Sequence, residues 1–303
     1  MKRFSFLTIL SLLISIDVHS QTNETYSELG AMLGTSYYLG DLNDKHFRQT
    51  QPAANIHYRY NLNNRLAIRA GFSAGQVRGS DKLNRIDTAK FNRNLHFRSN
   101  IYELSGVIEF NFLPYETGNR RYPFSPYIFT GLAMYNFNPQ ARQFDTENPF
   151  DNDGKDSNNP WLDLQPLGTE GQQSSHYPEK APYQLVQFAI PIGIGLKLSV
   201  GDNLSIALEY GMRKLFTDYL DDVGGLYADP QYLAMENLTA ALQSDKSNDL
   251  QDYLIANDGS DITTWTGNTG AARANENDWM DWYQFAGLSV AYKINKKSKV
   301  CQY

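Results

Sequence analysis

The sequence has very little cysteine and, beyond its N-terminus, no long apolar run. Cys301 is the one cysteine among the 303 residues, so no disulfide can form within the chain. A helix that crosses a bilayer needs about 20 consecutive apolar residues, and after the N-terminus no stretch stays apolar for that long. These two absences exclude a disulfide-stapled scaffold and a helical membrane protein.

Basic residues are also too few for a nucleic-acid-binding protein. The formal net charge is −6, whereas proteins that bind the phosphate backbone carry a basic patch or stripe. Glycine-rich phosphate-binding loops and internal repeats are not apparent either. We therefore expect no nucleic-acid partner.

The first twenty residues are typical of a secretory signal peptide. Lys2 and Arg3 precede an apolar run over residues 4–16, and cleavage is expected near Ser20. No cysteine lies at that point to accept a lipid, so the mature protein would reach a membrane through its own fold. We predict a signal peptide over 1–20, one barrel domain over 21–295 and a short basic periplasmic tail over 296–303.

Alternation of apolar and polar residues is what the sequence has in abundance. It is clearest over residues 186–200, where Val, Phe, Ile and Leu alternate with small or polar residues. A period of two predicts β-strands with one apolar face. The same pattern predicts strands over 26–39, 56–62, 66–74, 102–112, 127–137, 186–200, 204–213 and 282–294.

The connections between these strands alternate in length. They are short near Asn61, Pro114 and Gly201, and long over 41–51, 78–95, 138–182 and 219–280. Short turns on one side and long loops on the other are typical of outer-membrane barrels, and first and last strands that pair would close the sheet. We predict an all-β fold, a closed antiparallel transmembrane barrel of about eight strands. The alternative fold is a water-soluble sandwich.

Charged residues share the polar faces of the strands that would point into this barrel. Buried charges must be paired, and about eight strands leave room only for side chains. We therefore predict a filled interior with a salt-bridge network and no open channel. Its members would be Glu28, Arg59, Arg65, Arg69, Glu103, Glu109, Glu209 and Arg213.

The two ends of the barrel would differ in charge. The segment 219–280 is strongly acidic, whereas Arg120, Arg121, Lys296, Lys297 and Lys299 would lie on the periplasmic side. A basic rim can dock an acidic partner, or it can simply be solvated. Within the acidic segment, Asp229 and Pro230 predict the start of a helix that would cap the barrel mouth.

Catalytic and metal-binding signals are weak. His46, His57, His96 and His176 lack a surrounding nucleophile motif, and we expect no enzymatic activity. The residues Asp151, Asp153 and Asp156 resemble the opening of a calcium loop, but Lys155 occupies a ligand position and Leu162 replaces the final acid. Calcium is the one cofactor with any support. We expect the carboxylates of Asp218, Asp221 and Asp222 to be solvated and to bind no metal ion.

Several motifs resemble a known family. They are residues 27–30 with 37–42, the run Phe216-Thr217-Asp218-Tyr219-Leu220-Asp221-Asp222-Val223, and residues 275–279 leading into the final strand. In these motifs the chain resembles the PorG-like outer-membrane barrels of Bacteroidota. The most distinctive motif is the run that contains Thr217, Asp218, Tyr219, Asp221 and Asp222. The resemblance spans almost all of the mature chain, although the two largest loops are longer than the family's.

The resemblance implies a role in type IX protein secretion. There the family's barrel is a non-catalytic outer-membrane component that associates with a periplasmic ring, built from a ring-forming lipoprotein and its partner. The resemblance thus implies a barrel, embedded in outer-membrane lipid, that anchors or positions the ring. A surface structural or adhesion barrel and a lipid-modifying barrel enzyme are the alternative functions.

Overall fold

The computed structural model describes residues 25–83, 87–145, 159–257, 262, 264–274 and 280–294. Strands dominate, with short helices in the connections. The strands are β1 (Tyr26–Leu39), β2 (Gln51–Asn61), β3 (Leu66–Ser80), β4 (His96–Asn111), β5 (Phe124–Asn136), β6 (Pro139–Arg142), β7 (Trp161–Asp163), β8 (Val186–Val200), β9 (Leu204–Leu215) and β10 (Trp282–Lys293). The helices are η1 (Asp81–Leu83), α2 (Thr88–Arg93), η3 (Gln165–Leu167), α3 (Pro230–Glu236), α4 (Leu238–Ser244) and α5 (Asn248–Ala256).

The long strands form a closed antiparallel barrel. Its order is β1, β2, β3, β4, β5, β8, β9 and β10, and β10 pairs with β1 in antiparallel register, with Gly34 opposite Gly287. The short strands β6 and β7 extend the sheet beyond β4 at the loop end. The predicted eight-stranded barrel is confirmed, and the sandwich is wrong because the sheet closes on itself instead of folding into two layers.

The outside of the barrel is apolar. Leu33 and Leu132 are 73% and 70% exposed, and Phe188 and Ile194 project in the same way from their strands. A water-soluble protein buries such side chains, whereas a lipid-facing barrel surface exposes them. Among the described residues, no helix is both long and apolar enough to cross a membrane.

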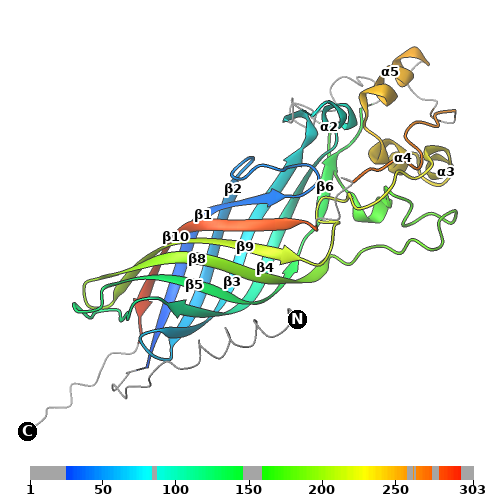
Figure 1. Cartoon of the computed structure of the whole chain (residues 1–303). Helices are drawn as coiled ribbons and strands as arrows, with labels where there is room; N and C mark the ends of the chain where they lie inside the picture. The colour runs from blue at the N-terminus through cyan, green and yellow to red at the C-terminus, as the bar shows by residue number, and fades with distance from the viewer. Residues whose placement is uncertain are drawn as a thin grey trace, which may run out of the picture.

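The connections differ at the two ends, as Figure 1 shows. Three short connections, over 62–65, 112–123 and 201–203, lie at one end, which we call the turn end. Gly201 takes φ of +68°, a backbone conformation that glycine adopts without strain. At the other end, the loop end, the helices α2 to α5 gather beyond the strands.

The helix predicted from Asp229 and Pro230 is confirmed in part. Asp229 caps α3 by accepting a hydrogen bond from the Gln231 backbone N–H at 2.8 Å. The predicted helix is two helices, however, because Asn237 leaves the helical conformation and caps α4 with its own side chain. Together with α5 these helices pack around a small core of their own, formed by Phe144, Ala228, Leu233, Ala241, Leu242, Leu250, Leu254 and Ile262.

Candidate functional site

The barrel interior is occupied by paired charges from six different strands. Alternation along each strand turns one residue in two inward, so these charged side chains meet where the sheet closes. At the centre, Glu109 forms ion pairs with Arg59, whose Nε lies 3.0 Å away, with Arg69, whose Nε lies 2.9 Å away, and with Lys197. Four carboxylates and four basic groups share the network, namely Glu28, Glu103, Glu109, Glu209, Arg59, Arg69, Lys197 and Arg213.

Two of these pairs have the two-pronged geometry that orients a guanidinium group rigidly. Arg213 donates to both oxygens of Glu103, at 2.8 and 3.1 Å. Arg69 donates to both oxygens of Glu209, and Tyr127 adds a hydrogen bond to Glu209 at 2.7 Å. All of these groups are buried, and the cavity beside Arg69 and Arg213 has a volume of about 10 Å³, roughly the room that one water needs.

The turn end of the barrel is closed by the β4–β5 connection. Tyr115 and Thr117 from this turn are buried under the strands. Thr117 donates its hydroxyl to Glu28, and its carbonyl accepts from Lys293 Nζ at 3.1 Å. The turn thus folds across the interior and is tied to the charge network.

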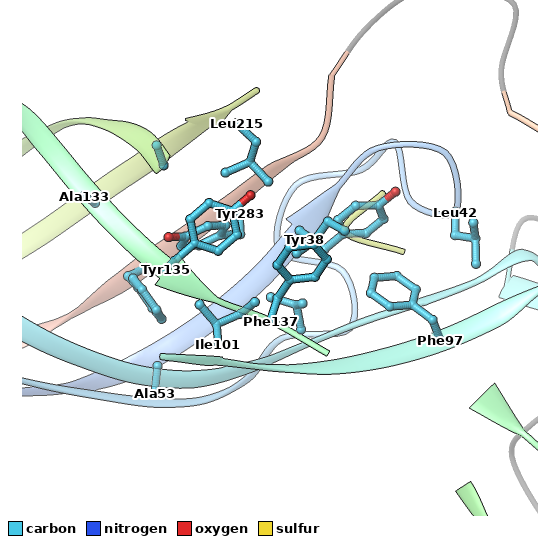
Figure 2. Close-up of a cluster of buried hydrophobic side chains, with 14 of the residues drawn as sticks. Tyr38, Leu42, Ala53, Phe97, Ile101, Ala133, Tyr135, Phe137, Leu215 and Tyr283 are labelled. Atoms are coloured by element: carbon cyan, nitrogen blue, oxygen red, sulfur yellow. The ribbon is translucent and has the colours of Figure 1, made fainter. Parts of the chain in front are cut away.

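The loop end is closed by aromatic side chains, shown in Figure 2. Tyr135 and Tyr283 lie with ring centroids 5.3 Å apart, and Phe137 stacks on Tyr135 at 5.6 Å. Tyr283 donates to Glu103 at 2.8 Å below this layer, and Tyr38 donates to Asp221 above it. The layer therefore separates the interior charges from a second polar cluster at the mouth.

The second cluster contains the family-like run over 217–222. Thr217 accepts from the Tyr219 backbone N–H at 3.2 Å, and Tyr219 stacks on Tyr183 at 4.8 Å. Asp218 is among the charged neighbours of Asp221 and Asp281. Asp221 and Asp222 are buried, so their expected solvation is wrong: the run folds down into the barrel mouth, where protein groups replace water.

Arg273 and Glu170 hold the segments of this cluster together. Arg273 donates to Glu170 at 3.1 Å and to the carbonyl of Ser244 at 3.1 Å. Glu170 also accepts from the backbone N–H groups of Gly224 and Gly225, at 3.1 and 3.2 Å. We call this assembly, residues 164–185 and 216–281 as far as they are described, the outer cap.

Burial perturbs the ionisable groups of the outer cap. It raises the pKa of Asp222 to about 6, although Arg273 and the hydroxyls of Thr169 and Tyr183 oppose the shift. It raises the pKa of Asp221 and of Asp281 well above the ordinary value, and the neighbouring carboxylates add to both shifts. Burial also lowers the pKa of Lys246 to about 7, helped by Arg273.

The structure brings together all of the predicted interior residues except Arg65. Arg65 lies in the β2–β3 turn, half-buried, and donates to the carbonyl of Phe112 at 2.6 Å. Its position in the alternation is inward, but β3 begins only at Leu66, so Arg65 stays in the turn outside the enclosed space. Lys197, Glu170 and Asp281 were not predicted. Alternation over 186–200 already placed Lys197 inside, whereas no sequence pattern marks the other two.

The remaining candidates lie elsewhere. Arg120 and Arg121 are exposed at the turn end, whereas Lys296, Lys297 and Lys299 lie outside the described residues. The calcium-like residues Asp151, Asp153 and Asp156 also lie outside them. Within the described ranges, no group of three or more His, Cys, Asp or Glu residues could hold a metal ion.

The histidines contact tyrosine, asparagine, backbone and glutamate groups. His46 pairs with the hydroxyl of Tyr37 at 3.0 Å, and His57 with Asn55 at 2.9 Å. His96 accepts from the backbone N–H of Arg142 at 3.1 Å, and His176 lies 3.5 Å from Glu236. None of these contacts places a serine hydroxyl against an imidazole base.

A family model described as a domain of unknown function (DUF6089) matches residues 3–158. The chain belongs to this family. No curated protein matches it.

Several solved outer-membrane proteins are similar in structure. Ail, the attachment invasion locus protein of Yersinia pestis, is 11% identical, with a TM-score of 0.38 over 89% of this chain and 99% of that one. Neisserial surface protein A is 7% identical, with a TM-score of 0.40 over 89% and 99%. OprG from Pseudomonas aeruginosa is 7% identical, with a TM-score of 0.36 over 90% and 99%.

Proposed function

We propose that this chain is an integral outer-membrane protein that anchors or positions the periplasmic ring of the type IX secretion system, without catalysis and without conducting substrate. The observation that carries the proposal is the filled barrel: paired charges occupy the interior, and each end is closed by side chains of the chain itself. A barrel of this kind supplies a rigid body in the membrane. It supplies no path through it.

The apolar outer face and the unequal ends support the membrane placement. In an outer-membrane barrel, short turns face the periplasm and long loops face outward. The turn end would then carry Arg120 and Arg121 into the periplasm, where both side chains are exposed. The assignment to type IX secretion comes from the resemblance over 27–42 and 216–223 to the PorG-like barrels, and the ring-forming lipoprotein with its partner would be what the barrel holds.

A pull-down from native outer membranes tests this proposal. Tagged full-length protein, extracted in mild detergent, is expected to recover the ring-forming lipoprotein and its periplasmic partner, as identified by mass spectrometry. Replacing two exposed charges, Arg120→Gln with Arg121→Gln, is expected to lower that recovery because rim charges contribute to docking. Lys45→Gln with Arg48→Gln, at the loop end, is the matched control and should leave recovery unchanged.

Two outcomes count against the proposal. A wild-type barrel that purifies without ring components contradicts the anchoring role. Full recovery with the double arginine variant contradicts the docking surface alone. In that second case the search would move to the other residues of the turn end.

The outer cap favours a second candidate function, a role at the cell surface. It has its own core and its own buried ion pair, between Arg273 and Glu170 at 3.1 Å. A barrel that needed only to sit in the membrane would not require so elaborate an outer end. Deleting the cap helices should then alter cell-surface binding while secretion continues.

A further inference from the structure

A cluster of arginines lies on the outer surface of the barrel, close to the loop end. Arg78 of β3 lies directly opposite Arg98 of β4, and Arg98 lies opposite Gln140 of β6. Arg142 is two residues farther along β6 and faces Trp161 of β7. Residues in register share one face of a sheet, so three guanidinium groups and one indole project together.

The indole contacts two of these cations. The guanidinium carbon of Arg98 is 3.9 Å from the ring centre of Trp161, and that of Arg142 is 4.7 Å away. A glutamine amide accepts from Nε of two of the arginines, Gln76 from Arg78 at 2.8 Å and Gln140 from Arg98 at 3.0 Å, and Arg142 donates to the carbonyl of Asn159. These contacts fix the planes of the guanidinium groups before any ligand arrives.

In the part of the chain that the structure describes, no carboxylate balances the cluster. Within the described ranges, none of the three arginines forms an ion pair, in contrast to every arginine of the barrel interior network. Asp163 of β7, which lies opposite Gln140, accepts instead from Asn138 at 2.9 Å and from Gln140 at 2.7 Å. Like charges directly opposite each other on a sheet destabilise it, and an anion between them would remove that cost.

The position of the arginine cluster along the barrel strands indicates which anion it binds. Along β4 the outward residues run from Phe110 through Ile108 and Leu104 to Tyr102, all apolar or aromatic, and then change to Asn100 and Arg98. This places Arg98 about 13 Å along the strand beyond Tyr102, at about 3.3 Å per residue. Tyrosines commonly mark the membrane interface, so the arginines lie where lipid headgroups begin.

We propose that Arg78, Arg98 and Arg142, with Trp161, bind the phosphate groups of a phosphorylated glycolipid of the lipid A class in the outer leaflet. This inference rests on the membrane placement in the proposed function, because that placement puts the loop end on the outside. Guanidinium groups bind phosphate through paired N–H donors, and the acyl chains would lie along the apolar face over Tyr102 and Leu104. The lipid would bind the barrel wall independently of any ring at the other end.

The test uses the full-length protein in detergent micelles and purified lipid A as the probe, with binding read by native mass spectrometry. Arg78→Gln, Arg98→Gln and Arg142→Gln together are expected to weaken binding on the order of a hundredfold, roughly fivefold for each arginine. Lipid A without its phosphates should bind the wild-type protein as weakly as the triple variant binds intact lipid A. The matched control, Lys45→Gln, Arg48→Gln and Lys214→Gln, removes the same charge from two exposed positions and one half-buried position outside the cluster, and should bind like wild type.

Three results overturn the inference. One is equal binding of lipid A by the triple variant and the wild-type protein. The second is equal binding of dephosphorylated lipid A, and the third is tighter binding of a soluble sulfated glycan than of lipid A. Loss of ring recovery with normal lipid A binding would contradict the anchoring role and leave this site intact, so the two failures are distinguishable.

Discussion

At the scale of single residues, the interior depends on Glu109 more than on any other acid. It is buried between Arg59, Arg69 and Lys197, each of which contacts it through a charged nitrogen. Replacing a buried ion pair by apolar groups can be neutral, but removing one partner leaves the others uncompensated. The network is therefore far more sensitive to the loss of one member than its net contribution to stability suggests.

We predict that Glu109→Gln lowers the free energy of unfolding by about 3–5 kcal/mol, the range for a broken buried pair. Urea unfolding in detergent micelles, followed by the heat-dependent shift of the barrel on a gel, measures it. Glu116→Gln is the control, because Glu116 is only partly buried and lies 3.5 Å from Lys293, so the loss there should stay below about 1 kcal/mol. Equal stability of both variants would contradict the structural role of Glu109.

Sequence alone could place most interior residues, because alternation decides which face each side chain takes. Arg65 shows the limit of that reasoning, since the alternation places it inside but β3 begins only at the next residue, Leu66. The acids of the mouth show another limit. Asp221 and Asp222 look like solvated loop residues in the sequence, and only the return of the chain over Tyr38 and Tyr183 makes them buried.

At the scale of elements, buried acids connect the outer cap to the barrel, and their burial disfavours the charged form of each acid. Asp222 contacts Arg273, Thr169 and Tyr183, and Glu170 lies nearby as a second charge. The pKa of Asp222 rises from 3.8 to about 6. A group with a raised pKa in the folded state contributes stability that is present below its unfolded pKa and lost as the pH rises through the folded pKa.

We therefore predict that the outer cap is held more tightly at pH 4 than at pH 7, with the change centred between 3.8 and about 6. Asp221 and Asp281 act in the same direction. Hydrogen exchange of residues 216–225, corrected for intrinsic rates, measures the effect. Asp222→Asn should reduce this pH dependence by about 2–3 kcal/mol, and the part that comes from Asp221 and Asp281 should remain.

Asp229→Asn is the matched control for the pH experiment. Asn caps a helix as well as Asp does, so α3 should persist and the pH dependence of residues 216–225 should match that of the wild-type protein. A cap in the wild-type protein whose exchange is the same at pH 4 and pH 7 would contradict the assignment.

The elements themselves were predictable to different degrees. All eight barrel strands follow from period two, because each has one lipid-like face and one polar face. Strands β6 and β7 do not, since Pro139–Arg142 and Trp161–Asp163 are too short to show a period. The helix α5 does not follow from the sequence either, because its nine residues are too few to show a helical period.

At the scale of the whole molecule, the protein is a closed body with unequal ends. The charge network fills the middle, the β4–β5 turn crosses the turn end, and aromatic rings with the outer cap close the loop end. Each closure is made by contacts within the chain, so none needs a bound partner. The central claim is that this barrel holds its place in the membrane and does not conduct.

Conductance across a planar lipid bilayer tests that claim most directly. Purified full-length protein, inserted at neutral pH in potassium chloride, is measured against an outer-membrane porin of known activity in the same bilayer. We expect insertion without steady open-channel current, because the cavity beside Arg69 and Arg213 is only about 10 Å³. A stable conductance comparable to that of the porin would contradict the filled interior and, with it, the anchoring role proposed for this chain.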